Sequence, residues 1–133
     1  MDKEKVLELL QEKQRRLETR RIEHYDPYDY QTKFHTEGQD CPQRILMAAN
    51  RVGKTYCGAA ETAYHLTGNY PEWWKGHKFN KPIRAWAAGE SNDTTRDIIQ
   101  KELFGNPQDP SKKGTGAVPL DNIVETVRKP GVP

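Results

Sequence analysis

The segment "RILMAANRVGKTYCGAAET", residues 44–62, constrains this chain more than any other. The apolar run RILMAAN comes directly before a loop that contains Gly-Lys-Thr, and a helix-compatible run follows the loop. The template of a phosphate-binding loop is G-x-x-x-x-G-K-[ST], and its context is a strand before the loop and a helix after it. Ala48 stands where the template has its first glycine, and Gly53, Lys54 and Thr55 complete the pattern. The segment therefore predicts a phosphate-binding loop without its usual first glycine.

Each residue type in this loop has a physical reason. Gly53 lets the backbone turn and come close to an anion, so that backbone N–H groups can point at phosphate oxygens. Lys54 supplies a point charge, and the Thr55 hydroxyl can complete a magnesium shell. The helix that follows offers its positive N-terminal end. The predicted nucleotide contacts in the loop are Ala49, Asn50, Arg51, Val52, Gly53, Lys54 and Thr55.

Arg51 lies within the loop, three residues before Lys54. In phosphoryl transfer an arginine stabilises the charge that develops on the transferred group. Arg51 and Lys54 are therefore the candidate catalytic residues, and Thr55 is the candidate metal ligand. Two alternatives remain open: Arg51 points away and pairs with a carboxylate, or the whole segment is a strand-turn-helix corner with an incidental Gly-Lys-Thr.

The acidic residues that hydrolysis requires do not follow the loop. A carboxylate on a second core strand holds magnesium, and another orients the attacking water. The expected signature is four apolar residues and then Asp-Glu, but the chain contains no Asp-Glu dipeptide. The nearest imitation is AVPLD, which ends at Asp121, and Pro119 argues against a central strand there. The sequence thus predicts the binding half of an ATPase site without its hydrolytic half.

Periodicity and stop signals predict alternating strands and helices. Helices are expected over residues 2–23, from Gln31 toward Gly38, over 54–67 and from Ser91 or Asn92 to Phe104, and strands over 44–50, 83–89 and 123–127. This order predicts an α/β fold with a parallel sheet and flanking helices, typical of a partial P-loop NTPase that is truncated before the Walker B strand, the strand that carries the Asp-Glu signature. Residues 1–24 are expected to form a charged N-terminal helix, and residues 25–133 the first part of the ATPase domain.

Composition bounds the class of protein but does not identify a partner. Charged residues make up 30% of the chain, apolar residues 34%, and the net charge of +2 permits nucleic-acid contact without arguing for it. No apolar run is long enough to span a membrane, and the N-terminus lacks the apolar core of a signal peptide. Two isolated cysteines favour a reduced cytosolic compartment. Trp73 and Trp74 are interpreted as anchors of a long connector, with stacking on nucleic-acid bases as the alternative.

The motif AANRVGKT resembles the deviant Walker A of the large terminase subunits of tailed phages, the ATP-driven motors that package DNA into proheads. That family often lacks the first glycine and carries an arginine in the loop. YDYQTKFH resembles the family's upstream segment, which implies that Gln31 and Tyr30 contact adenine. YPEWWKGHKF, the segment from Ile83 to Gly105, and the tail PGVP also resemble the family, so that the resemblance covers residues 25–133.

The resemblance implies an ATPase of the RecA/ASCE-like class with ATP and Mg²⁺ as cofactors. It further implies double-stranded DNA, the portal protein and the small terminase subunit as partners, a homo-oligomeric ring, no membrane, and the cytoplasm of the infected bacterial host. The family's Walker B strand and nuclease domain are not found in this sequence. The chain is therefore expected to bind nucleotide weakly and not to hydrolyse it. The alternatives are a fragment of a helicase-like P-loop NTPase and a non-hydrolysing remnant that acts as a binding module.

Overall fold

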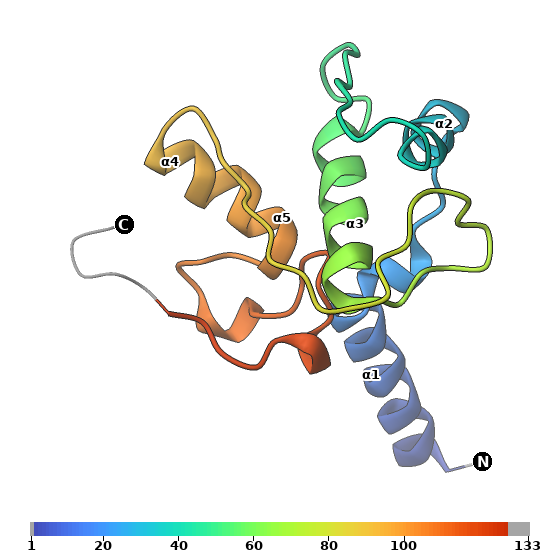
Figure 1. Ribbon diagram of the computed structural model, residues 1–133. Helices are drawn as coiled ribbons and strands as arrows, with labels where there is room; N and C mark the ends of the chain where they lie inside the picture. Colours follow the sequence, from blue (N-terminus) through green and yellow to red (C-terminus); the bar gives the residue numbers. More distant parts are fainter. Residues whose placement is uncertain (1, 128–133) are drawn as a thin grey trace.

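A computed structural model describes residues 2–127 and consists of helical segments grouped around one central helix, α3 (Figure 1). The 3₁₀ segments are η1, η3 and η4, and η2 is a π-helical stretch between α4 and α5. The tail PGVP lies outside the described residues. In chain order the elements are α1 (Lys3–Thr19), η1 (Arg21–His24), α2 (Asp29–Glu37), α3 (Lys54–Thr67), α4 (Asn92–Thr94), η2 (Thr95–Gln100), α5 (Lys101–Phe104), η3 (Pro110–Lys112) and η4 (Leu120–Asn122).

Helix α3 is central because its small buried side chains allow other segments to pack closely against it. Several of its buried positions are alanines, which leave room for neighbouring backbones, and it contacts both α2 and α5. The core around it joins segments from both ends of the chain, and it consists of Ile22, Ala59, Ala60, Ala63, Tyr64, Trp74, Leu103, Ala117 and Val118.

The helix boundaries follow the local signals in the sequence. Gly68 ends α3 in the left-handed conformation, with φ of 70°, as a C-cap glycine does. The Ser91 hydroxyl accepts a hydrogen bond from the Thr94 N–H and so caps α4. Gly105, with φ of 100°, ends α5. The predictions for these helix ends are confirmed, although the helix from Asn92 to Phe104 contains the π-helical stretch η2.

The predicted α/β fold is wrong for the part of the chain that the structure describes. No strand is present between residues 2 and 127, so there is no parallel sheet of a partial P-loop NTPase. Residues 44–50, 83–89 and 123–127 contain no helix or strand, apart from isolated turns and bends. The fold of the described residues is helical, with long irregular connections.

The physical reason is that a strand is stabilised by partners that lie elsewhere in a sheet. A strand's N–H and C=O groups must pair with a neighbouring backbone, which local sequence cannot supply. Here the apolar side chains of these segments face outward: Ile45 is 86%, Met47 87% and Trp86 98% exposed. The apolar character that predicted buried strands is present, but nothing in the described chain covers it.

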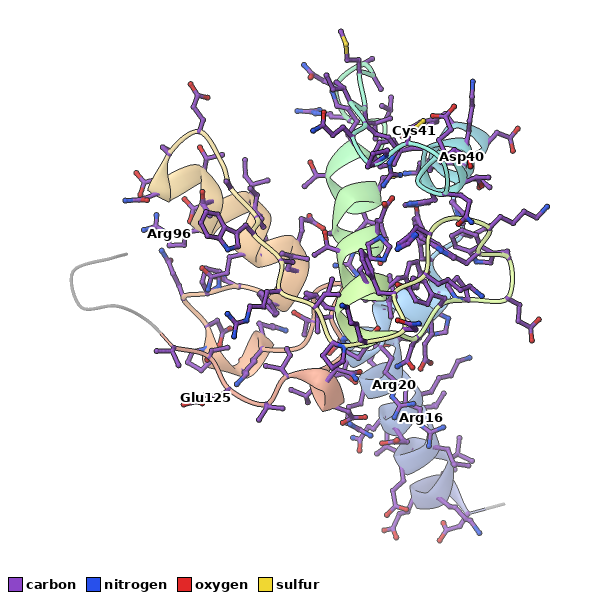
Figure 2. All side chains as sticks on the ribbon, viewed as in Figure 1. Arg16, Arg20, Asp40, Cys41, Arg96 and Glu125 are labelled. Atoms are coloured by element: carbon purple, nitrogen blue, oxygen red, sulfur yellow. The ribbon has the colours of Figure 1, made fainter. Side chains whose placement is uncertain are left out.

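Helix α1 projects from the rest of the molecule, and its side chains point outward along its length (Figures 1 and 2). None of the residues of α1 is buried. Glu12 pairs with Arg15 at 2.9 Å and Arg16 at 2.8 Å. The hydrogen bonds from these two guanidinium groups lower the pKa of Glu12 to about 2. Three of the charged side chains of α1 thus pair with one another on its own surface.

The two adjacent tryptophans anchor the connector after α3, as predicted. Trp74 is 4% exposed and packs in the core, and its indole N–H donates to the His77 carbonyl at 3.0 Å. Trp73 is half-buried and packs against the same cluster. Burial of large aromatic groups explains why this irregular segment lies against α3.

Two glycines of opposite kind give a test of this architecture. Gly58 lies in α3 with open space around an added Cβ, so Gly58→Ala should raise the free energy of unfolding by about 0.5–1 kcal/mol. Gly105 has φ of 100° and ψ of 177°, and an added Cβ would lie 2.0 Å from the Lys112 carbonyl oxygen. Gly105→Ala should lower the free energy of unfolding by about 1–3 kcal/mol or more, because alanine is strained in this conformation. Urea denaturation of both variants measures the difference, and equal effects would contradict the placement of α5.

The two cysteines should differ in reactivity. Cys41 is exposed, whereas Cys57 is fully buried in α3, and burial raises the pKa of the Cys57 thiol to about 11. Because the thiolate is the reacting form, a maleimide at pH 7 should modify Cys41 quickly and Cys57 only after unfolding. Mass spectrometry of the modified chain counts the thiols. Rapid double modification of the folded chain would show that α3 is not packed as described.

Candidate phosphate-binding site

The candidate site is built around the 48–55 loop, which leads directly into α3 (Figure 1). Gly53 is the N-cap of α3 and has φ of 89°, in the left-handed region that glycine adopts without strain. Arg51, with φ of 61°, is the one non-glycine residue with positive φ in the described chain. These two residues turn the backbone so that the loop meets the N-terminus of a 14-residue helix, whose first N–H groups have no partner within the helix.

The side chains of the loop divide into those that hold it together and those that are free. The Lys54 ammonium donates a hydrogen bond to the Ala48 carbonyl and so bridges the two ends of the loop. Thr55 is exposed at the first turn of α3. The Arg51 side chain is also exposed and pairs with no carboxylate within residues 2–127, which argues against the alternative in which it forms an ion pair. Arg51, Lys54 and Thr55 therefore lie on one short turn.

Helix α2 brings the two predicted base-contacting residues onto this loop. The Tyr30 hydroxyl donates to the Val52 carbonyl, and the Gln31 side-chain amide donates to the Gly53 carbonyl at 3.0 Å. The Gln31 side-chain oxygen accepts the Tyr28 N–H at 2.8 Å, which fixes the amide at the start of α2. Residues that are 22 positions apart in sequence are thus joined by direct hydrogen bonds. A Cβ on Gly53 would lie 2.8 Å from the Gln31 amide nitrogen, so a larger residue at position 53 would displace this amide.

A cavity of about 430 Å³ adjoins the loop on the side of α2 and η1. Gln31 and Gly53 form one end of it, and the Arg21 guanidinium lies 5.1 Å above the Tyr56 ring. Its volume lies in the range of small-molecule sites. The other lining residues are Leu17, His24, Tyr25, Asp26 and Tyr28.

Arg21 and Tyr56 are not predicted by the sequence analysis. Arg21 falls in the charged N-terminal segment, which was assigned to a separate region and gave no motif. Tyr56 directly follows the Gly-Lys-Thr signature and lies on the first turn of α3. Burial raises its pKa, and the nearby Arg21 partly offsets that effect. A signal for Tyr56 was available, because an aromatic residue on the first turn after such a loop can face whatever the loop binds.

A second cavity, of about 270 Å³, lies on the other side of the loop. Lys54 and Thr55 line it together with Trp86 and the Glu102 carboxylate of α5. Glu102 follows Lys101 in the sequence and belongs to no Asp-Glu dipeptide, so the expected signature does not identify it. The loop thus lies between two hollows, one with an aromatic ring and an amide, the other with a single acidic side chain.

Behind the loop, Glu61 of α3 collects three basic groups in the interior. The His35 ring Nδ1 lies 2.7 Å from the Glu61 carboxylate, and the Arg44 guanidinium donates to both carboxylate oxygens. The His65 ring lies 3.4 Å away. Burial raises the pKa of Glu61, but hydrogen bonds from His35, His65 and Arg44 outweigh it, and the pKa falls below its ordinary value. We call Glu61, His35, Arg44 and His65 the Glu61 cluster.

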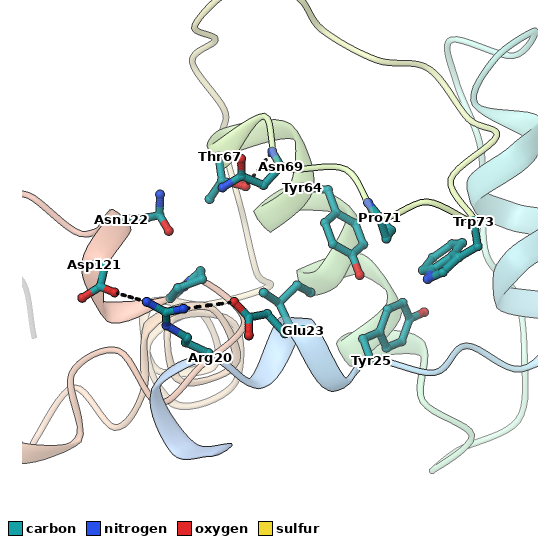
Figure 3. A pocket seen from close by; sticks show the side chains of 12 residues that line it. Arg20, Glu23, Tyr25, Tyr64, Thr67, Asn69, Pro71, Trp73, Asp121 and Asn122 are labelled. Atoms are coloured by element: carbon teal, nitrogen blue, oxygen red, sulfur yellow. Dashed lines mark hydrogen bonds and ion pairs between the residues drawn. The ribbon is translucent and has the colours of Figure 1, made fainter. Parts of the chain in front are cut away.

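A third cavity, also of about 430 Å³, lies away from the loop between η1, the end of α3 and η4 (Figure 3). Arg20 bridges two carboxylates at its edge, Asp121 at 2.9 Å and Glu23 at 3.5 Å. Tyr25, Tyr64 and Trp73 form its aromatic wall, and none of the residues predicted to bind nucleotide lines it. Arg20 here ties the C-terminal part of the described chain to η1.

Comparison with known proteins identifies the family. The model of the family described as "Terminase large subunit, T4likevirus-type, N-terminal" matches residues 45–132, about two-thirds of the chain. The terminase large subunit of Salmonella phage P22 is 35% identical over 140 aligned residues, which cover 96% of this chain. This chain spans 28% of the length of that relative. No solved structure is significantly similar.

The matched region contains the 48–55 loop, α3 and the later segments that pack on α3, whereas α1, η1 and α2 precede it. Among residues 2–127 no helix has the length and hydropathy that crossing a bilayer requires. The resemblance found in the sequence is confirmed, and this chain belongs to the terminase large subunits, of which it represents N-terminal sequence.

Proposed function

We propose that this part of the terminase binds ATP together with Mg²⁺ at the 48–55 loop. The observation that carries the proposal is the junction between α2 and the loop: Tyr30 and Gln31 donate to the carbonyls of Val52 and Gly53, next to Lys54 and Thr55. Groups suited to a purine base and groups suited to phosphates thus lie at the two ends of one short turn. A loop that served only as a chain corner would not need either set.

The phosphates would lie against the loop backbone. Free N–H groups at the N-terminus of α3 and the turn from Asn50 to Gly53 supply donors, and the helix end favours negative charge. Lys54, now on the Ala48 carbonyl, has two further N–H groups for a phosphate oxygen. The exposed Thr55 hydroxyl would contribute one oxygen ligand to Mg²⁺, which commonly keeps waters and phosphate oxygens as its other ligands. The cation would neutralise charge on the phosphates.

The base would enter the cavity between η1, α2 and α3. The Gln31 amide has two donors and two acceptor sites, and the contacts to Gly53 and Tyr28 use one of each. One donor and one acceptor remain, which is the pair that recognises adenine through its N7 and N6 positions. Tyr56, under the Arg21 guanidinium, offers a face for stacking. The proposal keeps the predicted contact of Gln31 with adenine, whereas Tyr30 supports the site through its hydrogen bond to the Val52 carbonyl instead of touching the base.

For the whole protein we propose ATP hydrolysis that drives viral DNA into a prohead. Arg51 is the candidate group for stabilising the charge that develops on the transferred phosphoryl group, since its side chain is exposed on the loop. Double-stranded DNA, the portal protein and the small terminase subunit are the proposed partners, in a homo-oligomeric ring in the cytoplasm of the infected host. We propose that the groups that activate water lie in the part of the whole protein that corresponds to the rest of the P22 subunit, of which this chain spans 28%.

Removal of the Lys54 charge should weaken ATP binding. Lys54→Ala loses a charged hydrogen bond to phosphate, worth about 1.5–3 kcal/mol, so the dissociation constant for MgATP should rise about tenfold or more. Isothermal titration calorimetry measures it. Lys13→Ala, an exposed lysine on α1, is the matched control and should leave the affinity unchanged. Equal affinities of the wild-type chain and Lys54→Ala would rule out the phosphate site.

Base recognition is tested separately by comparing ATP with GTP. Guanine presents an acceptor where adenine has its N6 donor, so the Gln31 oxygen should favour ATP by about tenfold. Gln31→Ala should remove this preference, whatever it does to absolute affinity, and Gln39→Ala, just beyond α2, should keep it. A wild-type chain that binds both nucleotides equally would contradict the role of Gln31 and leave the phosphate site to be judged by Lys54.

A further inference from the structure

We infer that the Glu61 cluster is a positioning device for the proposed nucleotide site, with Glu61 as the residue through which it acts. The inference rests on the proposed function for its purpose but on the structure for its geometry. Each of three basic residues approaches Glu61 from a different direction: His35 from α2, Arg44 from the start of the segment that leads into the 48–55 loop, and His65 from α3 itself. The cluster therefore touches both chain segments that flank the loop, and the helix that lies across it.

His35 connects the Glu61 cluster to Gln31 through helix α2. His35 lies one turn after Gln31, both are buried on the same face of α2, and their exposed fractions are 1% and 3%. Gln31 reaches the loop at Gly53, while His35 reaches Glu61 two turns along α3. Two contacts that are spaced along both helices fix the rotation of α2 about its own axis. The contact at His35 thus limits where the Gln31 amide can lie.

Arg44 joins the entry of the 48–55 loop to both α2 and α3. Its guanidinium donates to both oxygens of Glu61 and to the Phe34 carbonyl near the end of α2. It also lies 4.5 Å from the centre of the Phe34 ring. The entry to the loop is in this way joined to α2 and α3 by one planar group, and the geometry uses several of its N–H donors at once. A lysine at the same position has the charge but not this arrangement of donors.

Loss of a partner of Glu61 would destabilise the folded chain. The Glu61 side chain is 10% exposed, and a buried carboxylate without partners is strongly unfavourable. The remaining polar atoms of the cluster also have partners: the second His35 nitrogen lies 3.0 Å from the Tyr25 hydroxyl, and a His65 nitrogen lies 2.8 Å from that of Tyr70. Because every group is satisfied in this arrangement, α2 cannot shift on α3 without breaking a charged hydrogen bond.

The test uses Arg44→Lys, with Arg96→Lys as its matched control. The side chains of the two arginines are 18% and 19% exposed, and both are ion-paired, but Arg96 pairs with Asp93 and Asp97 around α4, away from the loop. The readout is the exchange with water of the Gln31 side-chain NH₂, followed by NMR in the chain without nucleotide. The Val118 backbone amide, bonded to the Leu103 carbonyl in the core, reports on global stability.

In Arg44→Lys, the Gln31 side-chain amide should exchange about tenfold faster, the change that corresponds to 1.4 kcal/mol, while Val118 stays as in the wild type. Arg96→Lys should leave the exchange rate of the Gln31 side-chain amide unchanged. Unchanged exchange of the Gln31 amide in folded Arg44→Lys would overturn the inference. Equal acceleration at Gln31 and Val118 would also overturn it, because Arg44 would then act only on overall stability.

Two substitutions of His35 test the cluster independently of Arg44, in case Arg44→Lys changes it too little or prevents folding. His35→Asn retains an N–H for Glu61 and should leave Gln31 exchange close to the wild type, whereas His35→Leu removes the donor and should accelerate it. Identical behaviour of the two variants would count against the cluster. If these effects occur but the wild-type chain does not bind ATP, the positioning device stands and the proposed function fails; the two failures are thus distinguishable.

Discussion

The buried carboxylate of Glu61 is the interaction on which the arrangement of the candidate site depends. It lies on the central helix α3, and its partners come from α2 and from the segment before the 48–55 loop. Because residues 2–127 contain no sheet that could fix these segments, polar contacts set much of their orientation. Glu61 with its basic partners acts at one end, and Gln31 with Gly53 acts at the other. The hydrophobic core around α3 supplies the affinity between the helices, and these directed contacts set their register.

The same constraint explains why the loop has its conformation. Gly53 must adopt a positive φ and also admit the Gln31 amide at close range, and Lys54 closes the turn on the Ala48 carbonyl. A loop held from both sides presents its N–H groups before any ligand arrives. Such preorganisation reduces the entropy that binding must overcome. If the loop binds phosphate as proposed, this gives a physical account of how it could be shaped for an anion without the first glycine of the template.

The helices were predictable from the sequence, because their signals are local. Gly68, Ser91 and Gly105 each act on the backbone within one turn, and the structure confirms each of them. The presence of strands could not be predicted, because strand pairing depends on segments that are distant in sequence. Trp86, which was predicted to lie in a buried strand, is 98% exposed. The α/β fold was inferred from the order of apolar and helical segments, and that order cannot show whether backbone partners exist.

The candidate site was predictable only in part. The loop residues follow from a motif. The family resemblance implied that Gln31 and Tyr30 contact adenine, which stays a prediction, and their hydrogen bonds to the loop carbonyls were not predicted. Arg21 and Tyr56 were missed, because a long-range contact between the N-terminal segment and α3 leaves no local pattern. Glu61 was missed for a related reason: a lone glutamate on an amphipathic helix is usually solvated, and only the fold shows that three basic groups surround it.

The central claim is that ATP binds between the 48–55 loop and α2, and NMR titration of the wild-type chain with MgATP tests it most directly. The account predicts the largest chemical-shift changes at the backbone amides of residues 49–55, at the Gln31 side-chain amide and at Tyr56. Titration with inorganic triphosphate should reproduce the changes in the loop but not those at Tyr56. Changes confined to the cavity beside Trp73, or no saturable change at all, would contradict it.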